Sequence, residues 1–297
     1  MAIWGVNLDE AELVSDAIVT IFNDLKTNED ALRDISEDSH YYRHLKEYFQ
    51  SWLKFLQYSS EIPVGTYFYR VRPLDSENIN GVDNISGLKY PRNGSRYGRM
   101  NNHSLNVMYA SYHEYTAIAE CQLKENADFQ LTKFKSLKPI KVFELGLFSR
   151  LYFSTPRDST LFKDQVRGLF NMDDVPDSTI RGFAALESGL MDGLYAVEES
   201  REIAYYLSSV ISDAIFTEFE YIDAIKYPSL QQRFGENFSF RENVADELDI
   251  SYTCVNKISK VYKSGTYKYY TRLECMDFTT DILEYKLVSE KNDTTYR

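Results

Sequence analysis

The first sixty residues show the apolar spacing of α-helices. Over residues 8–22, apolar side chains recur at steps of three and four, and Asp9 stands where a helix cap is expected. A second helix is predicted over residues 41–58 because a single apolar stripe runs along it. The stripe consists of Leu45, Tyr48, Phe49, Trp52, Leu53 and Leu56. Pro63 and Gly65 are predicted to end this N-terminal helical segment.

After Gly65 the apolar residues come in short runs that are typical of β-strands. Strands are expected at residues 67–71, 107–110, 141–145, 222–227, 254–258 and 265–270, and helices at 113–124 and 200–215. The last two strands are expected to be antiparallel and close to the surface. Residues 75–105 are rich in Asn, Gly and Ser and predict a long irregular segment, a kind that often carries function. Residues 150–195 have a mixed pattern that predicts no single element.

Composition and charge narrow the function classes. The 297 residues are 43% hydrophobic, enough to bury a core, and the formal net charge of −12 disfavours non-specific nucleic-acid binding. No stretch approaches 18 apolar residues, and no basic region precedes an apolar one at the N-terminus, so neither a membrane span nor a signal peptide is expected. Three cysteines without a paired spacing indicate a reducing, cytoplasmic setting.

Two arginines have positions that suit anion binding. Arg99 lies in the glycine-bearing segment Gly98-Arg99-Met100-Asn101, and Arg70 interrupts an apolar strand. A planar guanidinium binds phosphate or carboxylate through two parallel hydrogen bonds. The alternatives are a solvent-facing loop side chain for Arg99 and an ordinary edge-strand arginine for Arg70.

Three further residues combine into a possible site for breaking a ribosyl bond. The ring of Tyr109, at the end of an apolar strand, either stacks on a planar heterocycle or belongs to the core. Glu120 follows small and apolar helix residues, and a carboxylate is costly to bury unpaired, so it is either exposed or part of a site. Such a carboxylate stabilises the positive charge that develops on a sugar. Ser229, after Pro228, either points into a cleft or belongs to a turn.

In this order and spacing, these segments resemble the RES domain, a bacterial toxin family. The resemblance covers Tyr69 to about Phe240, a little over half of the chain. The segments that carry it are Tyr69-Arg70, Gly98-Arg99-Met100-Asn101, Tyr109-Ala110-Ser111, Ala117-Ile118-Ala119-Glu120, Tyr227-Pro228-Ser229 and Asn237-Phe238-Ser239-Phe240. Met100 departs from the family pattern, which more usually has an aromatic residue there.

The resemblance implies an α+β fold with an ADP-ribosyltransferase-like split antiparallel β-core and helices. The resemblance implies a RES-like NAD-binding core, and the local pattern adds an N-terminal helical segment before it and a β-rich C-terminal extension after it. These parts are expected to cover residues 1–62, 63–245 and 246–297.

The resemblance also implies roles for individual residues, with NAD as the substrate and no metal. Arg99 and Arg70 would bind the NAD phosphates and ribose, and Tyr109 would stack on nicotinamide. Glu120 would stabilise the oxocarbenium-like state, and Ser229 would orient the ligand. The remaining ligand contacts are expected from Asn101, Ser111 and Asn237.

Three functions follow as hypotheses. The first is an NAD-degrading toxin or defence effector that uses water or phosphate as the acceptor. The second is a protein mono-ADP-ribosyltransferase, and the third is an inactive RES-like protein that binds a partner. An antitoxin or regulatory protein and a second copy of the chain remain open as partners. The sequence does not distinguish water, phosphate and protein as the acceptor.

Overall fold

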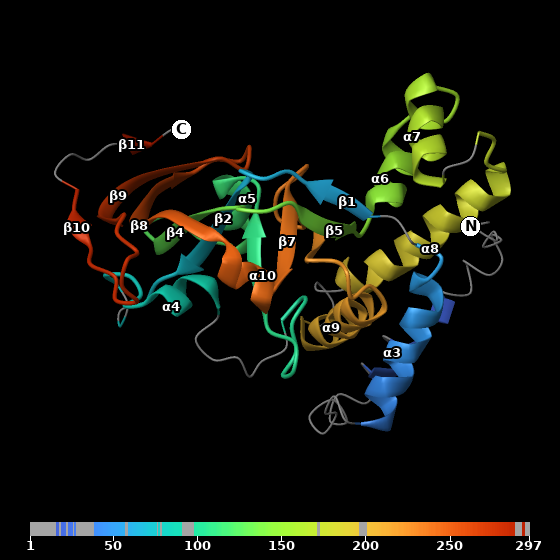
Figure 1. The fold of residues 1–297 in the computed structure, drawn as a ribbon, viewed down its shortest axis with the longest axis horizontal. Coiled ribbons are helices and arrows are strands. Elements are labelled where there is room, and N and C mark those ends of the chain that lie inside the picture. The colour runs from blue at the N-terminus through green and yellow to red at the C-terminus, as the bar shows by residue number, and fades with distance from the viewer. Residues whose placement is uncertain are drawn as a thin grey trace. The chain divides into compact units, whose positions relative to one another are not determined.

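A computed structural model shows the fold, and contacts within the chain group it into two compact units (Figure 1). The helical unit comprises residues 1–60, 95–105 and 143–222, and the sheet unit comprises 61–94, 106–142 and 223–297. The residues that the structure describes are 16–17, 19–21, 23–25, 27, 39–56, 59–75, 77, 79–90, 98–170, 173–195, 201–288 and 293–294. The expected division at residues 62 and 245 stays a prediction.

The strands form one sheet in the order β1-β5-β6-β7-β3-β2-β4-β8-β9-β10, with β11 also paired to β9. Every pair from β6 to β10 along this order is antiparallel. The bounds are β1 Ser59–Ile62, β2 Tyr67–Pro73, β3 Val107–Ser111, β4 Asp128–Lys135, β5 Ile140–Glu144, β6 Ala224–Pro228, β7 Glu236–Arg241, β8 Asp249–Val261, β9 Tyr267–Cys275, β10 Lys286–Leu287 and β11 Asp293–Thr294. The expected α+β class with a largely antiparallel sheet is confirmed.

The sheet is weakly joined between β2 and β3. These strands share one registered pair, Tyr69 with Ser111, whereas β2 pairs with β4 over seven positions and β3 with β7 over five. On one side of this junction lie β3, β7 and β6, and on the other lie β2, β4, β8 and β9. The junction is therefore the place where the two halves of the sheet separate from each other.

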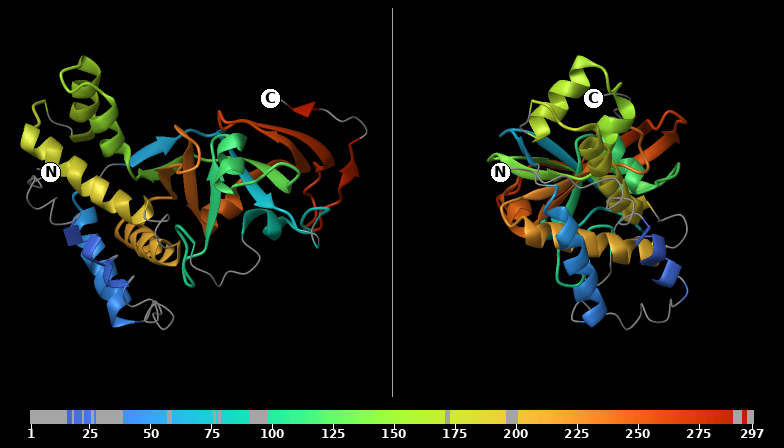
Figure 2. Two further views of the ribbon diagram at one scale, coloured as in Figure 1. Left: turned by 180° about the vertical axis from the view of Figure 1, so that it is seen from behind. Right: turned by 90° about the vertical axis from the view of Figure 1, so that its right-hand side faces the viewer.

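Side chains alternate between the two faces of the sheet because successive residues of a strand point in opposite directions. One face buries the apolar cluster that includes Phe68, Phe238 and Phe240, together with residues of α4 (Ile85–Lys89) and α10 (Glu242–Glu247). The other face buries a second cluster against α5 (Glu114–Glu120), so α5 and the pair α4 and α10 lie on opposite faces (Figure 1, Figure 2).

The helical unit contains α3 (His40–Leu53), α6 (Leu147–Ser154), α7 (Thr160–Phe170), α8 (Asp177–Tyr195) and α9 (Arg201–Glu218). Ser39 caps α3 by accepting the N–H of Tyr42 at 3.1 Å. Asp213 of α9 ties α3 down, since Tyr42 Oη and Lys46 Nζ both lie 2.9 Å from its carboxylate. Among the described residues, no helix is long and apolar enough to cross a membrane.

Most expected elements lie where the pattern placed them, with some corrections. Residues 59–62 form strand β1 rather than helix, and the helix expected to 124 ends at Glu120 because the chain turns at Gln122, whose φ is 51°. The irregular segment contains the short helix α4, and the mixed segment forms part of α6 and all of α7 and α8. Strands β4, β7, β10 and β11 and helix α10 were not predicted. The cap at Asp9 lies outside the described residues.

The expectation that the last two strands lie near the surface is wrong for β8. Strand β8 pairs with β4 on one side and β9 on the other, and Val255 and Ile258 are fully buried. Alternation of polar and apolar residues at 254–258 indicates a strand, but it does not reveal a second neighbouring strand that covers it.

Candidate functional site

Strand pairing brings the first two residues of the site together. Ser111 at the end of β3 is the register partner of Asn237 on β7, so both side chains lie on the same face of the sheet. Both are buried, and the Ser111 hydroxyl lies 2.7 Å from Asn237 Oδ1, to which it donates. The amide group of Asn237 is thereby oriented with its nitrogen available to a further acceptor.

That acceptor is Glu120, the last residue of α5. Asn237 Nδ2 donates to Glu120 Oε1 at 2.8 Å, and Ser229 Oγ donates to the same oxygen at 2.6 Å. We call these four residues (Ser111, Glu120, Ser229 and Asn237) the carboxylate cluster. Two donors on one oxygen hold the carboxylate in a single orientation. Glu120 is half-buried and hydrogen-bonded rather than exposed, and its place in a functional site stays a prediction.

The turn between β6 and β7 positions the Ser229 hydroxyl. Ser229 Oγ accepts the backbone N–H groups of Gln231 at 3.2 Å and Gln232 at 2.9 Å, which directs its own hydrogen toward Glu120. The backbone N–H of Ser229 donates to the Gly235 carbonyl at 2.8 Å and closes the turn. A Cβ atom at Gly235 would lie 2.7 Å from Thr116 Cγ2 on α5, so glycine permits the close approach of turn and helix.

Tyr109 lies on the same face of the sheet as the carboxylate cluster. It precedes Ser111 by two positions on β3, and its register partner on β7 is Ser239. The Tyr109 side chain is half-buried, whereas Ser239 is fully buried, and the Ser239 hydroxyl has no hydrogen-bond partner among the described residues. A half-buried ring beside an oriented carboxylate is compatible with the stacking expected of Tyr109.

Arg70 lies on β2, the strand next to β3 in the sheet, but on the face opposite the carboxylate cluster. Its neighbour Tyr69 is the register partner of Ser111, and Arg70 Nε donates to the Leu88 carbonyl at 2.9 Å. Burial lowers the pKa of the Arg70 guanidinium, and the nearby Cys121 and Tyr109 side chains partly oppose that shift. The structure thus gives Arg70 a backbone hydrogen bond, and its role toward a ligand stays a prediction.

Arg99 and Asn101 belong to the helical unit, in the segment 95–105. Asn101 is buried, and the segment is attached to α9 because the Ser212 hydroxyl donates to the carbonyl of Met100 at 3.0 Å. These two residues are therefore held by a different unit from the carboxylate cluster. Their expected contribution to the same site stays a prediction.

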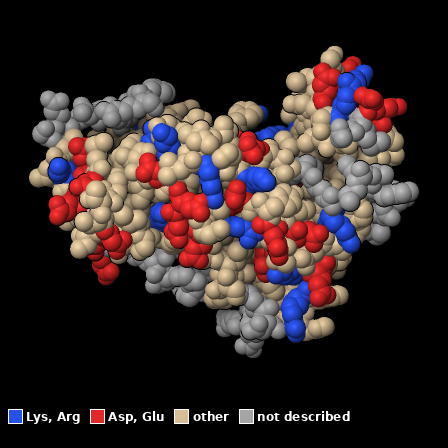
Figure 3. All heavy atoms as spheres, viewed as in Figure 1, with Lys and Arg blue, Asp and Glu red and all other residues tan. Residues whose placement is uncertain are grey.

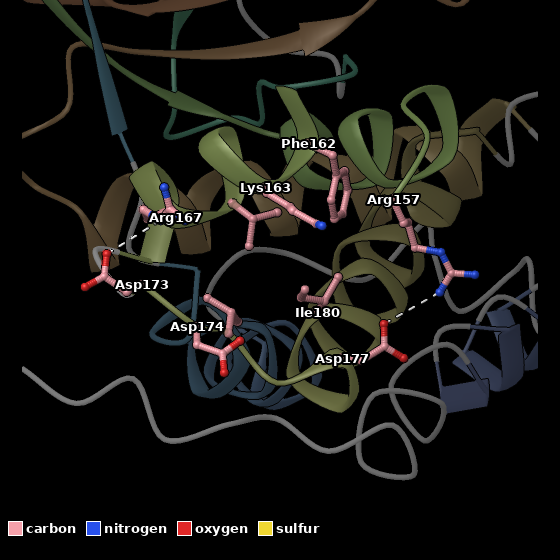
Figure 4. A pocket seen from close by; sticks show the side chains of 10 residues that line it. Arg157, Phe162, Lys163, Arg167, Asp173, Asp174, Asp177 and Ile180 are labelled. Atoms are coloured by element: carbon pink, nitrogen blue, oxygen red, sulfur yellow. Dashed lines mark ion pairs between the residues drawn. The ribbon is translucent and has the colours of Figure 1, made fainter. Parts of the chain in front are cut away.

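The described part of the helical unit contains a cavity of about 250 Å³ between α7 and α8, with none of the predicted site residues in its lining (Figure 4). Its apolar side chains include Phe162 and Ile180. Arg167 faces Asp173 at 3.6 Å, and Arg157 faces Asp177 at 3.7 Å, so these charges are paired with each other. The cavity offers no oriented donor set comparable to that around Glu120.

The thiol beside the cluster is half-buried. Burial raises the pKa of Cys121, the residue after Glu120, to about 12, and the thiol lies 3.5 Å from the carbonyl oxygen of Val71. Cys121 is therefore a neutral thiol near neutral pH rather than a nucleophile. Among the described residues, no group of three or more His, Cys, Asp or Glu side chains is arranged to hold a metal ion.

Sequence analysis assigned no role to Tyr69 or Ser239, although both face the same side as the carboxylate cluster. The signal for Ser239 was the alternation in Asn237-Phe238-Ser239-Phe240, where small polar residues and aromatic residues exchange at every position. The signal for Tyr69 appears only in the strand register, because nothing in the local pattern pairs it with Ser111.

The carboxylate cluster consists chemically of one carboxylate, Glu120, that neutral hydrogen-bond donors from Ser229 and Asn237 hold in one orientation. Such a group stabilises a positive charge on a sugar carbon when a ribosyl bond lengthens. A family model described as the RES domain matches residues 68–251, which is more than half of the chain and includes all the residues of the carboxylate cluster. No curated protein matches the chain.

Proposed function

The chain belongs to the RES domain family, and from this premise we propose that it breaks the bond between nicotinamide and ribose in NAD. The observation that carries the proposal is the geometry of Glu120. Its Oε1 atom accepts hydrogen bonds from Ser229 at 2.6 Å and Asn237 at 2.8 Å. A carboxylate held in this way needs no reorganisation when charge develops on the substrate, which is the condition for electrostatic stabilisation of a transition state.

The proposed step is a substitution at the ribosyl carbon. The C–N bond breaks, and nicotinamide leaves as a neutral base with the electron pair of that bond. A bond forms from the same carbon to an oxygen of water or of inorganic phosphate, and the proton of the attacking group passes to solvent. The positive charge of the nicotinamide ring in NAD spreads to the sugar during the step, where the Glu120 carboxylate stabilises it.

The remaining residues have supporting roles in this proposal. Tyr109, half-buried on the same face, stacks on the nicotinamide ring. Arg70 and Arg99 bind the phosphates and ribose, Asn101 contributes a ligand contact, and NAD is consumed as a substrate without a metal. The separation of the sheet between β2 and β3 supports an ADP-ribosyltransferase-like core.

The wider biological role is part of the same proposal. We place the enzyme in the cytoplasm as a toxin or defence effector that depletes NAD, with an antitoxin or another regulatory protein to restrain it. Transfer of ADP-ribose to a protein is the alternative outcome, since a protein acceptor would use the same carboxylate.

Incubation of the full-length protein with NAD tests the proposal, with and without inorganic phosphate and an added acceptor protein. Mass spectrometry then identifies the product. Nicotinamide with ADP-ribose indicates hydrolysis, and nicotinamide with ADP-ribose phosphate indicates phosphorolysis. ADP-ribose attached to protein indicates transfer. Failure to release nicotinamide under every condition, from folded protein, contradicts the proposal.

The variant Glu120→Gln tests the role of the carboxylate. It keeps the shape of the side chain and removes the charge, so the rate of nicotinamide release should fall about 100-fold or more with an unchanged thermal midpoint. The matched control is Glu236→Gln. Glu236 is adjacent to Asn237, points to the other face of β7 and pairs with Lys226 at 3.1 Å, so its variant should keep normal turnover. Equal turnover by both variants would remove Glu120 from the reaction.

A further inference from the structure

One row of side chains crosses the sheet at the level of the carboxylate cluster. The register pairs Tyr252 with Lys133, Lys133 with Tyr69, Tyr69 with Ser111 and Ser111 with Asn237. Register partners point to the same face of a sheet, so Lys133 on β4 lies on the face that carries the cluster. With strands about 4.8 Å apart, the two steps from β4 to β3 put the Lys133 backbone roughly 10 Å from that of Ser111.

Aromatic rings surround the ammonium group of Lys133. Its Nζ atom lies 3.9 Å from the ring centroid of Tyr67, 5.7 Å from that of Tyr69 and 5.8 Å from that of Tyr252. Each distance lies within the range of a cation–π contact. The three rings hold the ammonium group in place without neutralising its charge.

Lys133 differs from Lys226 and Lys257 of the sheet unit in its charge partners. Lys226 pairs with Glu236 at 3.1 Å, and Lys257 lies 3.7 Å from Asp128. Among the described residues, no carboxylate forms an ion pair with Lys133. On the face of the molecule seen in Figure 3, Lys and Arg side chains mostly lie beside Asp or Glu. A positioned cation with no carboxylate partner, in a protein of net charge −12, favours an anionic ligand.

We propose that Lys133, held by Tyr67, Tyr69 and Tyr252, binds the diphosphate of the dinucleotide whose ribosyl carbon lies at Glu120. This inference rests on the proposed function. In NAD the diphosphate follows the nicotinamide ribose, so an anion site displaced along the sheet from Glu120 matches the order of groups in the substrate. The half-buried side chains of Tyr69 and Tyr252 lie beside the ammonium group.

Steady-state kinetics with two substrates tests the proposal. In Lys133→Gln, the KM for NAD should rise about tenfold or more, since a hydrogen bond to a charged group is lost, while kcat stays within about twofold. Nicotinamide riboside has the scissile bond but no phosphate, so its turnover should be the same in the variant and the wild type. Lys133→Arg keeps the charge and should restore most of the NAD affinity.

The matched control is Lys135→Gln, on the same strand and the same face. Lys135 lies 5.9 Å from the Tyr67 ring but has Asp249 opposite it in the β4–β8 register. The control makes the same change in net charge and should leave the KM for NAD unchanged. An equal rise in both variants would indicate a general charge effect, and an unchanged KM in Lys133→Gln would indicate no contact with phosphate. Either result overturns the proposal.

Calorimetry with ADP separates this inference from the proposed function, because ADP carries the diphosphate but no scissile bond. Binding of ADP by the wild type and its loss in Lys133→Gln support the anion site even if NAD is not cleaved. Cleavage of NAD together with equal ADP affinity in both proteins overturns the anion site alone. If Lys133→Gln does not fold, Lys133→Met, which keeps the apolar stem against the rings, takes its place in both measurements.

Discussion

The two faces of the β3–β7 pair carry opposite chemistry within the same few residues. On one face, Phe238 is buried with its ring centroid 5.1 Å from that of Phe68 and 4.5 Å from that of Tyr112. On the other face, Asn237 accepts a hydrogen bond from Ser111 and donates one to Glu120. Residues that are adjacent in sequence therefore belong to the apolar core and to the candidate site.

The difference between the two faces shows how the fold accommodates buried polar groups. The apolar face gains stability from area removed from water, roughly 25 cal/mol per Å². The polar face buries Ser111 and Asn237, which costs free energy unless their hydrogen bonds are satisfied, and the carboxylate cluster satisfies them. The apolar face thus supplies stability, and the polar face holds a charged group in one orientation. Substitutions on the two faces should separate these two contributions.

The largest effect on stability is expected from Phe238→Ala. This substitution removes a fully buried ring from the apolar face and leaves a cavity, so the free energy of unfolding should fall by about 3–5 kcal/mol. Urea unfolding followed by circular dichroism measures it. Ser111→Ala on the other face is the control. It removes one hydrogen bond to Asn237 rather than a buried ring, so it should cost less stability than Phe238→Ala but lower NAD turnover. If Ser111→Ala were as destabilising as Phe238→Ala, the assignment of stability to the apolar face alone would be wrong.

A second, smaller effect is expected from Asn237→Asp, which affects turnover. The amide that donates to Glu120 at 2.8 Å is replaced by a second carboxylate, and two like charges raise the pKa of one member of the pair. Since ionised Glu120 is the active form in the proposal, the acidic limb of the pH–rate profile should move to higher pH by about one unit or more. At pH 7 the rate of nicotinamide release should fall on the order of tenfold.

The control for this variant is Asn106→Asp. Asn106 also donates its amide to a glutamate, Glu242, at 3.2 Å, but this pair is exposed. Solvent screens the added charge there, so the profile should not move. A profile for Asn237→Asp that coincides with the wild type would show that the carboxylate cluster does not set the protonation state that the reaction requires.

The smallest effect is expected from Ser239→Ala. The Ser239 hydroxyl is fully buried on the polar face and has no hydrogen-bond partner among the described residues. Replacing it with a methyl group removes an unsatisfied polar atom, so the free energy of unfolding should stay equal or rise by up to about 1 kcal/mol. Thermal unfolding measures this change. A loss of more than about 1 kcal/mol would indicate that a hydrogen bond is broken by the substitution.

Local pattern predicted the strand that carries Tyr109, because a short apolar run is a local property, but it did not predict β7, which carries Asn237. It identified α3 from its apolar stripe, whereas Ser111 and Asn237 were singled out by the family resemblance. It failed at residues 59–62, since a four-residue strand shows too short a period to distinguish from the end of a helix. It also missed the eight-residue strand β4.

The assembly of the carboxylate cluster depends on contacts that no local pattern encodes. Glu120 is 109 residues from Ser229 and 117 from Asn237 in sequence, and the three residues meet because β7 pairs with β3 while α5 packs against both. Backbone hydrogen bonds between strands are nearly independent of side-chain identity, so the order of strands follows from burial of the whole sheet. Family resemblance supplied this grouping as an expectation, and the structure supplied the distances.

The sequence by itself determined which residue types are present, which of them share a face of a strand and, through the order of its motifs, the family to which the chain belongs. Only the tertiary structure decided that Ser229 and Asn237 donate to the same oxygen of Glu120, that Arg70 points to the opposite face and donates to Leu88, and that Lys133 lies in the row of Ser111. The physical reason is that facing direction follows from the period of two along one strand, whereas neighbours across the sheet follow from non-local pairing, which the period does not specify.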